Sequence, residues 1–338
     1  NIALLLTVGE NRLGTYDAMA EVLRSTVLLG KDLSTNLEFH YGLVNWFIGN
    51  NINARPTTKF IVPYLTAVGL LKDQSNDLDV PYAYQQICAN TLAQIKDADE
   101  KANLQKIIVR KQLLLTRPIE RLLAEPHVLS GWLSVQQNNF DIQSNNQVQW
   151  LENPIRILAD TYHFLNMDFN NQDPAATMIW DHDNDVLQDA LSFYDSLETL
   201  LADAGFVDID YLELEEVIKG NAPEGFSADI WQQVQAAHVG YQAGFEVFNL
   251  LPYIANETDF FALDVNEDLS IFIPDALLDE TLQKNMMKVL VPPPTAKGDE
   301  ILAASGGMFY SCEAPGMPPF IQEGDHFEAG QPLYIVEV

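Results

Sequence analysis

The sequence DEILAASGGMFYSCEAPGMPPFIQEGDHFEAGQPLYIVEV, residues 299–338, alternates short apolar runs with residues that favour turns. The runs lie at 300–303, 308–310, 320–321 and 333–336. They are separated by glycine and proline, which interrupt regular structure: Gly306, Gly307, Gly324, Gly330 and Pro332. Short apolar runs bounded by tight turns predict a small all-β domain at this end of the chain.

The same residues resemble a biotin carrier domain, an all-β "hammerhead". In that family a Gly-Asp turn and a second glycine precede a strand that runs into a lysine hairpin, and Gly324-Asp325, Gly330 and residues 333–338 fit this order. The family strand continues into Met-Lys-Met, whose lysine carries biotin. The resemblance therefore implies a carrier truncated before its biotinyl lysine, with Glu337 and Val338 flanking the missing residue.

A second segment of the same resemblance is CEAPGMPP, residues 312–319. It occupies the place of the "thumb" of acetyl-CoA carboxylase carriers, which lipoyl domains lack. The resemblance assigns cofactor contacts to this thumb-like segment: Pro315, Gly316, Met317 and Pro318. Gly306-Gly307 departs from the family pattern, as does the absence of the lysine.

The first seventy residues predict a small α/β fragment. Residues 2–7 are expected to form a strand, Thr15 to cap a helix that Gly30 ends, and a second helix to follow Asn36. Their order resembles the tail of the C-terminal subdomain of biotin carboxylase, with Thr35-Asn36 and Thr58-Lys59-Phe60 at matching places. The ATP-grasp motifs of that family lie upstream, so none is carried over.

The middle of the chain has helical spacing. Helices are expected near 82–96, 98–115, 118–135, 147–165, 184–203 and 227–250. Pro118 suits a first helical position and Ser227 an N-cap. Two short strands are expected around residues 266–268, and Pro292–Pro294 is expected to be a stiff linker.

Together these patterns predict an α+β chain that is mostly α. Its expected domains are a small α/β N-terminal fragment at 1–71, an acidic helical bridging domain at 72–288 and a partial all-β carrier at 289–338. A chain of 338 residues is long enough for several cores of this size.

The formal net charge of -30 is distributed unevenly, since most of the 18 lysines and arginines lie between Arg12 and Arg121. Such acidity disfavours nucleic acid and anionic membranes as partners. The opening apolar run is too short for a signal peptide, and Cys88 and Cys312 form no metal or disulfide pattern. A soluble, cytoplasmic protein is expected. The acidity fits either a solvated surface or a docking face for a basic partner.

No catalytic or metal site is expected in this chain. His238 lies on an apolar helical stripe without a nucleophile or carboxylate near it in sequence, which favours a satisfied core histidine. Residues 181–185 and the set Asp264, Asn266, Asp268 and Asp275 resemble calcium loops, but both lack the required glycine. A helix N-terminus and a hairpin turn explain them better.

The resemblance implies a fragment of a biotin-dependent acyl-CoA carboxylase. It implies biotin on a lysine outside this chain, and ATP, bicarbonate and Mg²⁺ in the parent enzyme only. The expected partners are the biotin carboxylase and carboxyltransferase modules, in a possible homo-oligomer. This chain would position the carrier and have no activity alone. Two alternatives stay open, a lipoyl-type carrier and a non-enzymatic interaction scaffold with an unmodified hammerhead.

Overall fold

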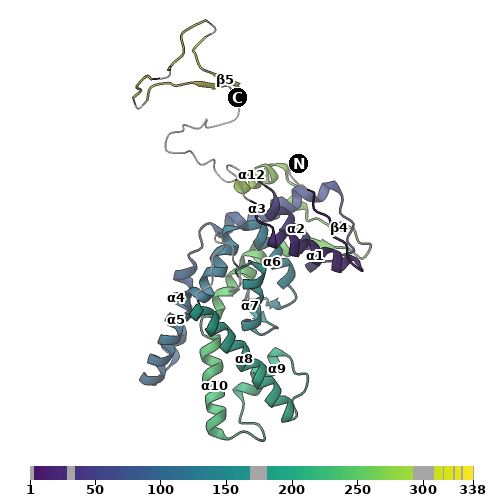
Figure 1. The fold of residues 1–338 in the computed structure, drawn as a ribbon, viewed down its shortest axis with the longest axis vertical. Helices are drawn as coiled ribbons and strands as arrows, with labels where there is room; N and C mark the ends of the chain where they lie inside the picture. Colours follow the sequence, from purple (N-terminus) through teal and green to yellow (C-terminus); the bar gives the residue numbers. More distant parts are fainter. Residues whose placement is uncertain are drawn as a thin grey trace. The chain divides into compact units, whose positions relative to one another are not determined.

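The computed structural model describes residues 4–28, 35–167, 181–291 and 308–337, apart from 315, 323 and 329. The chain divides into two compact units, residues 1–290 and 291–338, which we call the helical unit and the β unit. Figure 1 shows the elements of both units.

The helical unit confirms the mostly helical prediction. Its α-helices are α1 Arg12–Ser25, α2 Leu37–Gly49, α3 Ile61–Ser75, α4 Val80–Gln94, α5 Ala98–Ala124, α6 Pro126–Gln136, α7 Pro154–Phe164, α8 Asp181–Asp203, α9 Tyr211–Lys219, α10 Ala228–Gln242, α11 Leu250–Glu257 and α12 Glu280–Leu290. Short 3₁₀ turns connect some of them, at η1 Thr58–Phe60, η2 Phe245–Asn249, η3 Phe260–Ala262 and η4 Asp275–Leu278. No described helix has the length and apolar character needed to cross a bilayer.

The strands described in the chain form two-stranded antiparallel sheets. In the helical unit β1 Phe140–Ile142 pairs with β2 Val148–Trp150, and β3 Asp264–Val265 pairs with β4 Ile271–Phe272. The second hairpin confirms the strands expected around residues 266–268. The first occupies part of the helix expected at 147–165, because α7 begins only where Asn153 accepts a hydrogen bond from the Ile155 amide and Pro154 follows.

The expected N-terminal strand is wrong, since residues 4–9 form no strand in the described part of the chain. The first helix begins earlier than predicted, because Asn11 and not Thr15 is its N-cap. The Asn11 side chain accepts from the Gly14 amide at 2.9 Å, while the Thr15 hydroxyl bonds back to the Asn11 carbonyl. The helix ends at Ser25, and Gly30 lies outside the described residues. The second helix follows Asn36 as predicted.

Helix α5 is one continuous helix, although a new helix was predicted at Pro118. A proline inside a helix removes the amide that would bond to the carbonyl four residues earlier. That carbonyl belongs to Leu114, and it accepts a hydrogen bond from the Tyr162 hydroxyl at 2.9 Å. The replacement donor from α7 explains why the helix continues past Pro118.

Helices α2 and α6 lie side by side with their backbones in contact (Figure 1). A Cβ atom at Gly42 would lie 2.1 Å from the His127 carbonyl oxygen, and one at Gly49 would lie 2.0 Å from the Ser134 carbonyl oxygen. Only glycine permits such an approach. In the same way Gly69 of α3 lies against Met286 of α12.

These contacts place the first seventy residues in the same core as the rest of the helical unit. The predicted boundary between residues 71 and 72 therefore separates no domains: it falls inside α3, and α3 packs on α12. The other predicted boundary, at 288 and 289, lies two residues from the division at 290 and 291. The predicted linker Pro292–Pro294 lies outside the described residues.

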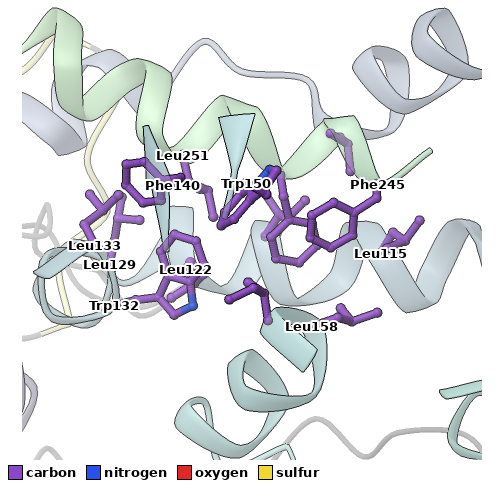
Figure 2. Packing of buried hydrophobic residues seen from close by; sticks show 14 of the residues in the cluster. Leu115, Leu122, Leu129, Trp132, Leu133, Phe140, Trp150, Leu158, Phe245 and Leu251 are labelled. Carbon is purple, nitrogen blue, oxygen red and sulfur yellow. The ribbon is translucent and has the colours of Figure 1, made fainter. Parts of the chain in front are cut away.

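The middle of the core is built where α5, α6, α7 and the β1–β2 hairpin meet (Figure 2). Its aromatic members include Trp132, whose indole N–H donates to the Thr161 hydroxyl at 3.0 Å, and Trp150. The aliphatic side chains around them are buried: Leu115, Leu122, Leu129, Leu133, Leu158 and Leu251. Burial of this many large apolar side chains is the main stabilising contribution to the unit.

Two helices expected from the sequence have different outcomes. The helix expected at 184–203 is present as α8, which buries Leu187, Tyr194 and Leu201. The helix expected at 227–250 starts correctly after Ser227, which accepts from the Ile230 amide, but it stops at Gln242. Gly244 has a φ of 83°, which ends α10 and leads into η2.

Candidate functional site

The thumb-like segment forms a closed loop in the β unit. Cys312 and Pro319 make an antiparallel bridge, and the Phe320 amide donates to the Ser311 carbonyl at 2.9 Å. The turn at the loop's tip is closed by the Met317 amide, which donates to the Ala314 carbonyl at 3.0 Å. Gly316 has a φ of 86° there, and Pro315 lies outside the described residues.

The predicted approach strand is present in part. Strand β6 Ile335–Glu337 pairs with β5 Met308–Tyr310 in the register Met308 with Glu337, Phe309 with Val336 and Tyr310 with Ile335. Glu337 therefore ends a paired strand, while Val338 lies outside the described residues. Residues 320–321, expected to be a strand, form none, and the run at 300–303 is not described.

The two predicted glycine turns are confirmed. The Asp325 amide donates to the Gln322 carbonyl at 3.0 Å, and the Gln331 amide donates to the Glu328 carbonyl at 3.1 Å. Gly324 and Gly330 are the third residues of these turns, with φ values of 93° and 91°. Glycine is favoured at this place because a left-handed φ is strained for other residues. The Asp325 carboxylate also accepts from the Gln322 amide at 2.9 Å.

Apolar side chains are unusually exposed on the β unit. Met308 and Phe309 of β5 are 63% and 61% exposed, and Met317 and Phe327 are exposed as well. Phe309 contacts Tyr334, with ring centroids 5.2 Å apart. The described part of this unit thus presents an exposed apolar surface beside the β5–β6 pair.

Comparisons with known proteins return no relative. No family model, no curated protein and no solved structure matches this chain.

His238 is buried on α10 as predicted, but a carboxylate does lie beside it. Its Nδ1 is 2.8 Å from the Tyr194 hydroxyl, and its Nε2 is 3.8 Å from Glu215 Oε1. Burial lowers the pKa of His238. The buried, hydrogen-bonded ring confirms the predicted satisfied core histidine. The neighbouring Glu215 was not foreseen, because it comes from α9, 23 positions earlier in the sequence, and no local motif indicates the contact.

Glu215 is shared by several groups. Its Oε1 accepts from the Tyr211 hydroxyl at 2.9 Å, and its Oε2 accepts from Lys219 Nζ at 3.2 Å. Tyr194 in turn accepts from the Gln242 side-chain amide at 2.8 Å. The two hydrogen bonds of Tyr194 join α8 to α10, and the approach of His238 to Glu215 brings α9 beside them, as Figure 1 shows.

Lys111 is a buried lysine that sequence reasoning missed. Its Nζ donates to the carbonyl oxygens of Gly240 and Tyr241, both at 2.7 Å, at the C-terminal end of α10. Burial lowers its pKa to about 7. A cation suits the negative end of a helix dipole, so the residue ties α5 to the end of α10.

The two segments that resemble calcium loops form a helix start and a hairpin with a following 3₁₀ turn. Residues 181–183 begin α8. Asp264, Asn266 and Asp268 lie in the β3–β4 hairpin, whereas Asp275 begins η4. The Asp268 carboxylate accepts from the amide and the hydroxyl of Ser270, which lowers its pKa. Within the described residues no three acidic, histidine or cysteine side chains come together as metal ligands.

Proposed function

We propose that this chain is part of a cytoplasmic, biotin-dependent carboxylase that acts on an acyl-CoA. In this proposal the β unit is part of the biotin carrier module, and the helical unit is a bridging region that holds it between two active sites elsewhere in the protein. The chain itself makes no bonds in the reaction.

The observation that supports the proposal is the pairing of β5 with β6 around a closed thumb-like loop. In the sequence order that resembles a carrier, β5, the thumb-like loop, the two glycine turns and β6 each have hydrogen bonds, whereas residues 320–321 form no strand. A lysine continuing from β6 would stand at the end of a strand that is fixed by its partner. An attached biotin would then carry the carboxyl group on a tether whose base is rigid.

The other groups of the proposed reaction belong to other modules. ATP, bicarbonate and Mg²⁺ would be used in the biotin carboxylase module, and the acyl-CoA would bind in the carboxyltransferase module. The resemblance of the N-terminal segment to biotin carboxylase contributes less support, because residues 4–7, the described part of the strand expected before α1, form no strand.

Mass spectrometry tests the proposal directly. The protein is purified from its source, and the peptide that runs through Glu337-Val338 is sequenced by fragmentation. We expect a biotinylated lysine directly after these residues. A biotinylated protein of the same cells serves as the control for biotin supply.

Each other outcome rejects the proposal for a defined alternative. Lipoate on that lysine would indicate a 2-oxo acid dehydrogenase carrier. An unmodified peptide from biotin-replete cells, or a peptide without lysine, would indicate an interaction scaffold.

A further inference from the structure

The helical unit contains a cavity that plays no part in the proposed carrier function. Its volume is about 610 Å³, within the range of small-molecule sites. It is open to solvent on one side and lined by the β1–β2 hairpin, α9, the end of α10, η2 and the start of α11. Several elements distant in sequence thus converge on one hollow.

The charge of the lining excludes anionic ligands. Two carboxylates face the cavity, Glu215 and Glu246, and none of the described residues that line it is a lysine, arginine or histidine. A phosphate or carboxylate would meet no cation there, and would be repelled by a chain of net charge -30. The cavity is therefore unsuited to a nucleotide or to the phosphates of an acyl-CoA.

The two carboxylates differ in how they are compensated. Glu215 is already held by Tyr211 and Lys219. No hydrogen bond or ion pair to the Glu246 carboxylate exists among the described residues. Partial desolvation raises the pKa of Glu246, although the residue as a whole is exposed. The Glu246 carboxylate would therefore be stabilised more than that of Glu215 by a positive charge on a bound ligand.

Aromatic side chains line the cavity beside the carboxylates. The Trp150 indole N–H donates to Asn249 Oδ1 at 2.8 Å, and its ring packs edge-on against Phe245 at 5.6 Å, as Figure 2 shows for the two rings. The indole is thereby held in place before any ligand arrives. Tyr253 also lines the cavity and is 43% exposed. Aromatic faces next to a carboxylate favour organic cations, which bind by cation–π attraction and by an ion pair.

We propose that this cavity binds a small organic ammonium ion, with the charged group at Glu246 and the apolar body against Trp150 and Tyr253. The amide side chains around the rim, Gln149, Gln242 and Asn249 among them, offer donors and acceptors to further polar groups of the ligand.

The test uses the full chain and benzylammonium as the probe, measured by isothermal titration calorimetry in 0.1 M salt. Benzyl alcohol and benzoate are the neutral and anionic analogues of the same shape. We expect weak but saturable binding of benzylammonium, binding about tenfold weaker for benzyl alcohol, and none for benzoate.

Two variants of equal charge separate the site from the acidic surface. Glu246→Gln is expected to weaken benzylammonium binding about tenfold, whereas Glu224→Gln, an exposed glutamate outside the cavity, leaves it unchanged. Trp150→Leu is expected to weaken binding too, because it removes the aromatic face. The melting temperatures of Trp150→Leu and of Trp150→Phe, which keeps an aromatic face, show whether a loss of binding comes from a loss of folding. Equal effects of the two glutamate variants would overturn the proposal, since they indicate general attraction to a negative protein. Equal affinity for benzyl alcohol would also overturn it, because the positive charge would then not matter. Tighter binding of the uncharged sugar maltose would overturn it for the same reason.

Discussion

The Tyr162 hydroxyl donates to the Leu114 carbonyl oxygen at 2.9 Å, and this carbonyl is the one that Pro118 deprives of its helical donor. A side chain of α7 thus completes the backbone bonding of α5. The bond is buried, and it makes the continuity of a 27-residue helix depend on a residue outside that helix.

Replacing Tyr162 by phenylalanine should destabilise the protein by roughly 1–3 kcal/mol, because the Leu114 carbonyl would stay buried without a donor. Urea unfolding followed by circular dichroism measures this loss. Tyr253→Phe is the control, since Tyr253 is exposed and forms no hydrogen bond within the described residues.

A double-mutant cycle identifies the cause of that loss. Pro118→Ala restores the amide that can bond to Leu114, so Tyr162→Phe should cost about 1 kcal/mol less in the Pro118→Ala background. An equal cost in both backgrounds would show that the tyrosine acts through packing and not through the carbonyl.

Gly42→Ala should destabilise the protein by about 1–3 kcal/mol or more, because the new methyl group would collide with the His127 backbone and push α2 away from α6. The melting temperature is compared with that of Gly14→Ala. A Cβ atom at Gly14 meets only Asn11 Oδ1, at 3.6 Å, and alanine favours the helix, so this control should be neutral or stabilising. Loss of stability in both variants would contradict the close packing of α2 on α6.

Lys111 should give the protein a stability that rises with pH above neutrality. Its pKa is about 7 in the folded chain against 10.5 for a free lysine, so between these values the unfolded chain binds the additional proton. The free energy of unfolding should then increase by up to about 1.4 kcal/mol per pH unit from pH 7 upwards. Unfolding midpoints between pH 7 and 9.5 measure the slope.

Lys111→Met should remove that slope, while Lys101→Met, on the exposed N-terminal part of the same helix, should keep it. Parallel curves for the wild type and Lys111→Met would show that the lysine is charged in the folded chain throughout this range.

His127 should have the same sense of pH dependence in the acid range. Burial lowers its pKa from 6.5 to about 4, and its Nδ1 has no hydrogen-bond partner among the described residues. The unfolded chain therefore binds the proton first, and stability contributed by the neutral ring is lost as the pH falls from 6.5 towards 4. NMR of the ring protons should show His127 neutral at pH 5. A charged His127 at pH 5 would contradict the prediction.

Local patterns in the sequence predicted those features that depend on neighbouring residues. The start of α2 after Asn36, the N-cap at Ser227, helix α8 and the turns at Gly324 and Gly330 are all of this kind. Each is set by residues within a few positions of one another, where the spacing of apolar residues and the needs of a turn act directly.

The features that the sequence did not indicate depend on contacts between distant segments. Pro118 reads as a helix start until Tyr162 supplies the missing donor, and Gly69 gives no sign that Met286 packs against it. Lys111 reads as one more basic residue of α5, although its partners are carbonyl groups about 130 residues away. The cavity beside Glu246 has the same origin, because its walls come from segments between Ile87 and Tyr253.

The register of the β unit also has a mechanical meaning. Met308 pairs with Glu337, so the first residue of β5 and the last residue of β6 lie side by side at one end of the sheet. Tension applied through the chain at these two residues would act along the interstrand hydrogen bonds and load them one pair at a time, since the bonds of an antiparallel pair run across the strands. The two strands would then separate one residue pair at a time, starting with Met308 and Glu337. Strand β6 can therefore detach from β5 from its Glu337 end while the thumb-like loop keeps its shape. Only after the last pair, Tyr310 with Ile335, has separated would the force reach that loop.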